Sequence, residues 1–350
     1  MIEVGFMRRL SLALLMLATL GAPAWAGMGM TEIALAGNGA GSGPVTVYYS
    51  SAEAEQPQHF GPLTLSLALN AKPQRGNGRL VLISHGSGGS PWVHADLARR
   101  LVGAGFIVAM PAHQGDNYKD PGRPGPDSWA LRPLEMSRAI DALAAEPRFA
   151  PLLALDKVGA YGGSAGGHTV LSLAGGRWSR AGFKQHCESH LADDFQACVG
   201  LTTRLNGDWL DALKLWAARL IIAFKFDDAR PQQYVDPRIA AVVASVPAAA
   251  DFDMSTLEQP SIPLGLVTAR QDRWLHPQWH SDEVLKACAQ RCEWLADLPQ
   301  GGHGAMLSPL PPGFTGLLGH LLNDPPGFDR SSLAEVDRQI TDFMQRHLLD

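Results

Sequence analysis

Short apolar runs alternate along this chain with longer segments whose apolar positions recur at helical spacing. The runs at 80–84 (LVLIS) and 106–110 (FIVAM) are continuously apolar, as expected of strands covered on both faces of a parallel sheet. Segments 94–103 and 134–145 place apolar residues three and four positions apart, which predicts helices. Further strands are expected at 45–50, 63–69, 158–161, 239–246, 264–268 and 294–298, and further helices at 166–174 and 333–349.

This series of strand, crossover helix and strand predicts an α/β fold with a mainly parallel central sheet flanked by helices. Residues 27–350 have the length of one large domain. The alternation breaks at about 176–236, which includes an amphipathic stretch at 209–226. We interpret 176–236 as an insertion that forms a cap or lid over the C-terminal edge of the sheet. The Gly- and Ala-rich residues 27–43 are expected to be frayed.

The first 26 residues have the pattern of a cleavable export signal. A short basic head at 7–9 (MRR) precedes an apolar run at 10–20, and Ala24-Trp25-Ala26 has the small-x-small pattern of a cleavage site. The run is too short for a bilayer, which needs about 20 apolar residues. We therefore predict a signal peptide at 1–26 and a periplasmic or secreted mature protein without a stable membrane span.

Composition narrows the class of protein. Hydrophobic residues make up 46% of the 350 positions, as in globular enzymes, and the formal net charge is -5. A mildly acidic chain is a poor partner for nucleic acid, which requires a basic face. The sequence carries no signal for an oligomeric state.

The chain has four cysteines, and export to an oxidising compartment permits disulfides. Of the three possible connectivities we favour the local one, which pairs Cys187 with Cys198 and Cys288 with Cys292. A zinc site is the alternative, but the spacing does not match the usual paired ligand motifs.

The strongest chemical signal is Gly162-Gly-Ser164-Ala-Gly166, which matches the G-x-S-x-G pattern of a nucleophilic serine. It follows a predicted strand and precedes a predicted helix, which is the setting that this motif requires. The helix N-terminus then favours negative charge developing near Ser164. The alternative is a glycine-rich turn with a solvated serine.

A nucleophilic serine needs a base and an acid that orients it. His303 lies between glycines after the last predicted strand, and Asp272 lies just beyond a buried strand. Ser164, Asp272 and His303 then occur in the order serine, acid, histidine along the chain. Asp251 and Asp253 are the alternative acids, and Asp272 could instead be a surface aspartate paired with a neighbouring arginine.

Other histidines compete for a role. His168 lies four residues after Ser164 on the same predicted helix, so its side chain is expected to point away from the serine. His276 and His280 could hold a metal if helical, but no carboxylate cluster in the sequence supports this. His85 and His94 flank a glycine-rich loop and are interpreted as scaffolding. No metal and no organic cofactor are expected.

The loop at 84–89 (SHGSGG) follows an early strand, as an oxyanion-binding loop does. We predict that the backbone N–H groups of Ser87 and Ala165 form an oxyanion hole. A phosphate-binding loop is the alternative, but the lysine and the glycine spacing of such loops are missing.

These motifs together resemble the α/β-hydrolase superfamily. More narrowly, the chain resembles the bacterial predicted dienelactone hydrolases, which are related to platelet-activating-factor acetylhydrolases and polyester-cleaving esterases. The resemblance covers roughly residues 44–346, with serine at 164 where dienelactone hydrolases proper use cysteine. The matching segments are 47–49, 83–89, 106–117 and 162–167, together with Asp272 and His303.

The resemblance implies a serine hydrolase that cleaves carboxylic esters, with a small-molecule or lipid-like ester as its substrate. Two alternatives stay open at this stage. One is a peptidase or amidase of the same fold, and the other is a catalytically inactive binding protein.

Overall fold

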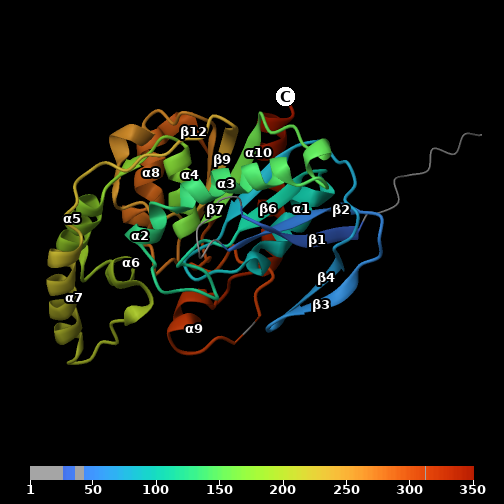
Figure 1. Cartoon of the computed structure of the whole chain (residues 1–350). Coiled ribbons are helices and arrows are strands. Elements are labelled where there is room, and N and C mark those ends of the chain that lie inside the picture. Colours follow the sequence, from blue (N-terminus) through green and yellow to red (C-terminus); the bar gives the residue numbers. More distant parts are fainter. Residues whose placement is uncertain (1–26, 36–42, 312) are drawn as a thin grey trace, which may run out of the picture.

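A computed structural model describes residues 27–35, 43–311 and 313–350 (Figure 1). The predicted signal peptide at 1–26 lies outside the described residues. Within the described part of the chain, no helix is both long and apolar enough to cross a membrane.

The centre of the molecule is a sheet of ten strands in the order β12-β11-β9-β7-β5-β6-β2-β1-β4-β3. A separate pair joins β8 to β10. The strands are β1 (Gly27–Ala34), β2 (Pro44–Ser51), β3 (Gln56–Phe60), β4 (Leu63–Leu69), β5 (Leu80–Ser84), β6 (Ile107–Pro111), β7 (Val158–Gly163), β8 (Arg177–Trp178), β9 (Ile239–Ser245), β10 (Phe252–Asp253), β11 (Leu264–Ala269) and β12 (Cys292–Leu298).

Helices cover both faces of this sheet (Figure 1). The α-helices are α1 (Ala95–Gly103), α2 (Pro126–Trp129), α3 (Arg132–Ala145), α4 (Ala165–Leu173), α5 (Arg180–His190), α6 (Phe195–Val199), α7 (Asp211–Lys225), α8 (Ser281–Cys288), α9 (Gly316–Leu322) and α10 (Leu333–Leu348). The α/β class and the mainly parallel sheet flanked by helices, as predicted, are confirmed.

The strands from β12 to β6 run parallel to one another, and β2 joins them antiparallel to β6. Because both faces are covered, the side chains of β5, β6, β7, β9 and β11 are buried on both sides, whereas the edge strand β12 is largely exposed. In β5, Leu80 and Leu82 enter one hydrophobic core, whereas Val81 and Ile83 enter the other. This alternation explains why the run LVLIS has no polar position until its last residue.

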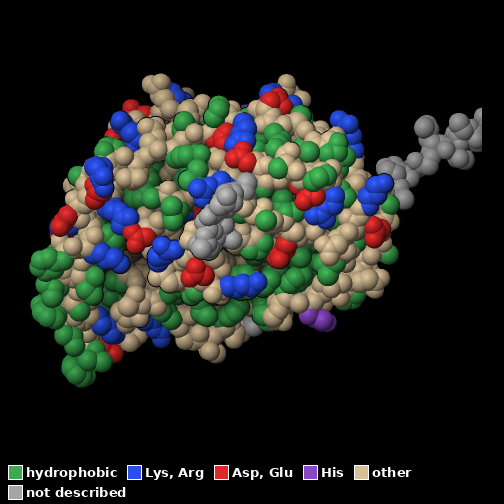
Figure 2. Space-filling model, in the orientation of Figure 1, with side chains coloured by type: hydrophobic (Ala, Val, Ile, Leu, Met, Phe, Trp, Pro, Cys, Tyr) green, Lys and Arg blue, Asp and Glu red, His purple; other side chains and the backbone are tan. Residues whose placement is uncertain are grey.

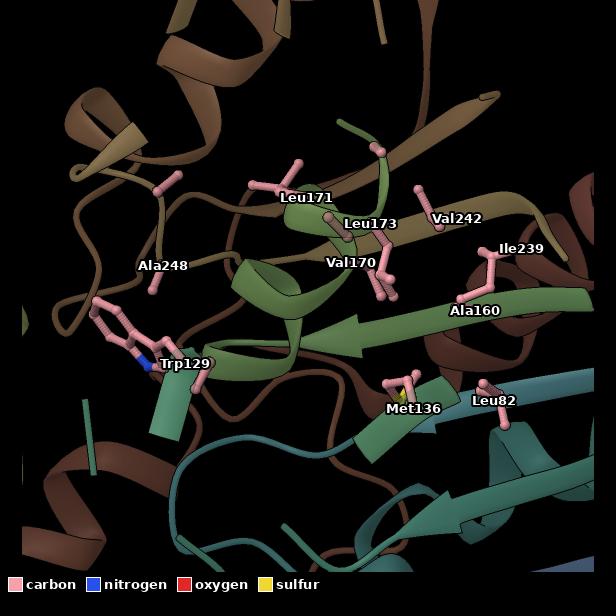
Figure 3. Packing of buried hydrophobic residues seen from close by; sticks show 14 of the residues in the cluster. Leu82, Trp129, Met136, Ala160, Val170, Leu171, Leu173, Ile239, Val242 and Ala248 are labelled. Carbon is pink, nitrogen blue, oxygen red and sulfur yellow. The ribbon is translucent and has the colours of Figure 1, made fainter. Parts of the chain in front are cut away.

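One core lies between the sheet and the helices α3 and α4, and the other between the sheet and α1 and α10. Figure 3 shows part of the first, in which Val170 and Leu173 of α4 lie near Ala160 of β7 and Val242 of β9. This packing fixes α4 against the sheet, so the turn that joins β7 to α4 has a rigid support on each side.

The segment predicted as an insertion, 176–236, is mainly helical and holds α5, α6 and α7. These helices lie together at one end of the molecule (Figure 1). Cys187 of α5 is bonded to Cys198 of α6, and Cys288 is bonded to Cys292, with Cα–Cα distances of 5.6 Å in both pairs. The local pairing expected from the sequence is therefore the one that the structure contains.

The prediction that residues 27–43 are frayed is wrong for its first part. Residues 27–34 form β1, which pairs antiparallel with β2 from Gly27↔Ser51 to Ala34↔Pro44. Gly29 is required in this strand, because a β-carbon there would lie 2.3 Å from the ring of Tyr49. The start of β1, which is rich in glycine and methionine, lacks the β-branched and aromatic residues typical of strands. Its extended conformation therefore depends on pairing with β2.

Candidate functional site

Four loops that follow parallel strands meet at one edge of the sheet. They follow β5, β7, β11 and β12, and they carry Ser87, Ser164, Asp272 and His303 respectively. Parallel strands bring their carboxyl ends to the same edge, so residues far apart in the sequence become neighbours.

Ser164, His303 and Asp272 form a continuous hydrogen-bonded series. His303 Nε2 lies 2.9 Å from Ser164 Oγ, and His303 Nδ1 lies 2.7 Å from Asp272 Oδ2. Asp272 is buried, whereas Ser164 and His303 are partly exposed. The serine can therefore be reached from solvent while the acid is shielded from it. These distances allow proton transfer from the hydroxyl to the ring.

Ser164 sits in a strained backbone conformation at the turn between β7 and α4. Its φ is 57° and its ψ is -119°. A non-glycine residue in such a conformation costs about 1–3 kcal/mol, and the surroundings must hold it there. The Ser164 N–H donates to the carbonyl of Ser245 at 3.0 Å, and the Ser164 carbonyl accepts from the N–H of Ala248 at 3.1 Å.

The glycines of the motif allow close approach of backbone to backbone. A β-carbon on Gly162 would lie 2.0 Å from the carbonyl oxygen of Gly166, and one on Gly166 would lie 1.9 Å from that of Ser84. Gly163 differs, because the nearest atom to its β-carbon would be 3.8 Å away, on His94. The outer glycines of G-x-S-x-G are thus sterically required, and Gly163 is not.

The carboxylate of Asp272 is fixed by backbone donors. Its Oδ1 accepts from the N–H groups of Trp274 at 2.8 Å and Leu275 at 2.9 Å, which leaves Oδ2 directed at His303. Arg270, the arginine two residues before it, forms ion pairs with Asp282 and Asp297. The alternative of a surface aspartate paired with a neighbouring arginine therefore does not apply to Asp272.

The alternative acids serve other contacts. Asp251 is buried and lies 3.0 Å from His168 Nε2, and the His168 ring stacks on Trp129. His168 thus binds a different carboxylate from the one that His303 binds, in agreement with a side chain that points away from Ser164. Asp253 is exposed and caps a short 3-10 helix at Ser255.

The loop after β5 lies directly beside the serine. A β-carbon on Gly86 would be 3.3 Å from Ser164 Cβ, a tight contact that would require a shift of a few tenths of an ångström. Ser87 follows, and its hydroxyl donates to Asp116 Oδ1 at 2.5 Å. Ala165 is the first residue of α4, where N–H groups lack an acceptor within the helix. Gly86, the neighbour of Ser87, and Ala165 thus lie beside the serine, and the oxyanion hole expected from the N–H groups of Ser87 and Ala165 stays a prediction.

A buried ionic network that the sequence analysis missed supports this loop. Arg132 is completely buried, and it donates to Asp116 Oδ2 at 2.8 Å and to the carbonyl of His85 at 2.5 Å. Asp116 also accepts from the N–H of Gly88 and the hydroxyl of Ser128. Asp116 lies within the segment 106–117 on which the family resemblance was based. Arg132 belongs to no motif, and it contacts the loop at 84–89 only because the folded chain brings α3 beside it.

Within this network the Arg132–Asp116 pair is charged, whereas the buried His113 ring is neutral. Burial alone would raise the pKa of Asp116, but the Arg132 guanidinium and the donors around it outweigh burial and lower that pKa. Burial, with Arg132 nearby, lowers the pKa of His113 well below its ordinary value. His113 is therefore a neutral ring at neutral pH, and it links Ser84 Oγ at 2.7 Å to Glu135 Oε2 at 2.6 Å.

One group among the described residues has ligand types suited to a metal. His186, Asp194 and His280 place one ligand atom each within 4.8 Å of the others. His280 Nδ1 accepts the N–H of Ala249 at 2.9 Å, so the ring hydrogen lies on Nε2, the atom directed at Asp194. A metal bound to His280 Nε2 would move the ring hydrogen to Nδ1. The Nδ1 hydrogen would then point at the hydrogen of the Ala249 N–H, and the hydrogen bond between them would be lost.

We therefore interpret this group as a structural clamp. Asp194 Oδ2 accepts from His186 at 2.8 Å and from His280 at 3.0 Å, and it ties the α5–α6 region to the start of α8. Burial would raise the pKa of Asp194, but the two histidine donors lower it further than burial raises it. From the sequence, His280 was expected only as a possible metal-binding partner of His276.

No model of a known protein family matches this sequence, and no curated protein matches it at a significant level. The chemistry of the site therefore rests on its geometry.

Proposed function

We propose that this protein is a serine hydrolase that cleaves carboxylic esters, built on an α/β-hydrolase fold with 176–236 as its cap. The observation that carries the proposal is the series Ser164 Oγ, His303 Nε2, His303 Nδ1 and Asp272 Oδ2, with spacings of 2.9 and 2.7 Å. A strained serine at a strand-to-helix turn, with the acid and the histidine on loops after later strands, supports it further.

In this mechanism His303 removes the proton from the Ser164 hydroxyl while Oγ attacks the acyl carbon of the ester. The carbonyl oxygen becomes an oxyanion, which the N–H groups of Ser87 and Ala165 stabilise; one such donor contributes about 3 kcal/mol. His303 then gives its proton to the alcohol oxygen as the C–O bond breaks, and an acyl-serine and a free alcohol result. Asp272 stabilises the imidazolium and holds the ring in the required tautomer.

Water completes the cycle. His303 takes one proton from a water molecule as its oxygen attacks the acyl-serine, and the collapse of the second tetrahedral intermediate returns that proton to Ser164 Oγ. The acid leaves, and the enzyme is restored.

The test is hydrolysis of short p-nitrophenyl esters by the wild-type protein and by Ser164→Ala, with a fluorophosphonate probe as a second measurement. We expect the substitution to lower kcat by about 10⁴-fold or more. Mass spectrometry should place the probe on Ser164. Full activity in the variant, or a folded wild-type protein that neither hydrolyses esters nor reacts with the probe, would reject the proposal.

A further inference from the structure

Helix α7 exposes an unusually apolar face. Its exposed large side chains, together with Trp209 just before the helix, define what we call the α7 ridge: Trp209, Leu213, Trp216, Leu220, Ile221 and Phe224. Trp209 is 83% exposed and Phe224 is 79% exposed. Figure 2 shows hydrophobic side chains gathered at the extremity of the molecule where Figure 1 places α7. Monomeric proteins rarely expose a contiguous apolar patch of this kind without a use for it.

The opposite face of α7 is already occupied. Ala218 and Ile222 are buried, and Phe226 packs edge-on against Phe183 of α5 with ring centroids 5.1 Å apart. From Leu213 to Phe224 the ridge residues recur three and four positions apart, except for the adjacent Leu220 and Ile221, so they line one side of the helix. The helix is therefore anchored to the protein by a few residues, of which Phe226 is the largest, while the other large aromatic side chains face outward.

Cations accompany the ridge. Between 204 and 228 the chain carries the cations Arg204, Lys214, Arg219 and Lys225 and the acids Asp208, Asp211, Asp227 and Asp228. Each of these four acids already forms an ion pair with a lysine or an arginine. Lys214 is paired with Asp211 at 2.7 Å. Arg219 and Lys225 form no ion pair with any residue that the structure describes, and the Lys225 ammonium lies over the Phe226 ring, 5.5 Å from its centroid.

We propose that the α7 ridge docks onto an anionic lipid surface, with its apolar side chains in the headgroup region and Arg219 and Lys225 near the lipid phosphates. Tryptophan and phenylalanine beside basic residues on one helix are typical of helices that lie in a membrane interface. Each basic residue near an anionic surface contributes about 1 kcal/mol. A second copy of the chain fits less well, because it would gather the unpaired cations of both copies at one interface.

The experiment is flotation of the protein with phosphatidylcholine vesicles that do or do not contain phosphatidylglycerol. The variants are Trp216→Ser/Phe224→Ser, which removes apolar area, and Arg219→Gln/Lys225→Gln, which removes charge. Leu69→Ser/Leu349→Ser is the matched control, because both leucines are exposed and lie outside the α7 region. Circular dichroism and activity on a soluble short ester confirm that each variant is folded.

We expect the wild type and the control to float with the anionic vesicles. The apolar variant should lose about tenfold or more in partition coefficient, and the charge variant about fivefold per cation removed at low salt. Wild-type protein that stays in the lipid-free fraction, or variants that float as well as the control, would overturn the proposal. A stable dimer in light scattering that only the α7 variants abolish, without flotation of the wild type, would assign the ridge to a second copy instead.

Discussion

Arg132 and Asp116 form a buried ion pair directly behind the loop that carries Ser87. The guanidinium donates to Asp116 Oδ2 at 2.8 Å, and Asp116 Oδ1 accepts from the Ser87 hydroxyl at 2.5 Å. Arg132 also donates to the carbonyl of His85 at 2.5 Å. The pair thus determines where the backbone between 85 and 88 lies relative to Ser164, although neither residue touches the serine.

Asp116→Asn is expected to lower both stability and kcat. It leaves Arg132 buried beside a neutral partner, and breaking such a pair costs about 3–5 kcal/mol. Displacement of the loop should lower kcat on a short ester by about 10- to 100-fold, with a smaller change in KM. Urea unfolding and steady-state kinetics on the folded protein measure the two effects. A variant that is less stable but turns over at the wild-type rate would show that the pair supports the fold alone.

Gly166→Ala and Gly163→Ala form a matched pair within the serine motif. The added methyl group would lie 1.9 Å from the Ser84 carbonyl oxygen in the first variant and 3.8 Å from its nearest neighbour in the second. We expect the first change to destabilise the protein by about 3 kcal/mol or more, since backbone must move. The second should stay within about 1 kcal/mol of the wild type. Equal urea midpoints for both variants would contradict this account of the turn.

Asp337 on α10 gives the protein a pH-dependent stability. Burial, with Asp96 nearby, raises its pKa to about 7 from an ordinary value of 3.8. The folded state therefore binds a proton more tightly than the unfolded chain does. The stability that this proton contributes is fully present below pH about 4 and is lost as pH rises to about 7.

Asp337→Asn should remove this dependence, because the amide does not titrate. The variant is expected to be more stable than the wild type at pH 8, by a few kcal/mol at most, and about equally stable at pH 3. Urea unfolding of both proteins across this pH range gives the difference directly. A difference that does not change with pH would show that Asp337 does not titrate in this range.

Asp194 should act as a clamp and not as a metal ligand. Asp194→Ala leaves His186 and His280 without their shared acceptor, so we expect a loss of about 3 kcal/mol. Zinc chloride should not raise the Tm of the wild type above its value in EDTA, because His280 Nε2 carries the ring hydrogen. A zinc-dependent rise in Tm that disappears in Asp194→Ala would establish a metal site.

Local patterns were sufficient for the parallel strands of the sheet and for the three residues of the proposed triad. Runs such as 80–84 are apolar throughout because both faces of a parallel sheet are covered, and this requirement is visible in the sequence. Ser164 and Asp272 follow the buried strands β7 and β11, and His303 follows the edge strand β12, so their meeting at one edge follows from parallel topology. The G-x-S-x-G pattern also identified Gly162 and Gly166, where only glycine allows the close approach of backbone to backbone that this turn requires.

Other contacts join segments that are distant in the sequence and carry no recognisable motif, and these were determined by the tertiary structure alone. Arg132 is the first residue of α3, and nothing in the local sequence distinguishes it from an exposed arginine. Its burial beside Asp116 and the His85 carbonyl results from the tertiary fold. β1 becomes a strand because β2 offers it a partner edge, against a composition rich in glycine and methionine. Local sequence determines which backbone conformations and which buried faces are favourable, whereas the pairing of distant polar groups depends on distances that only the packed chain sets.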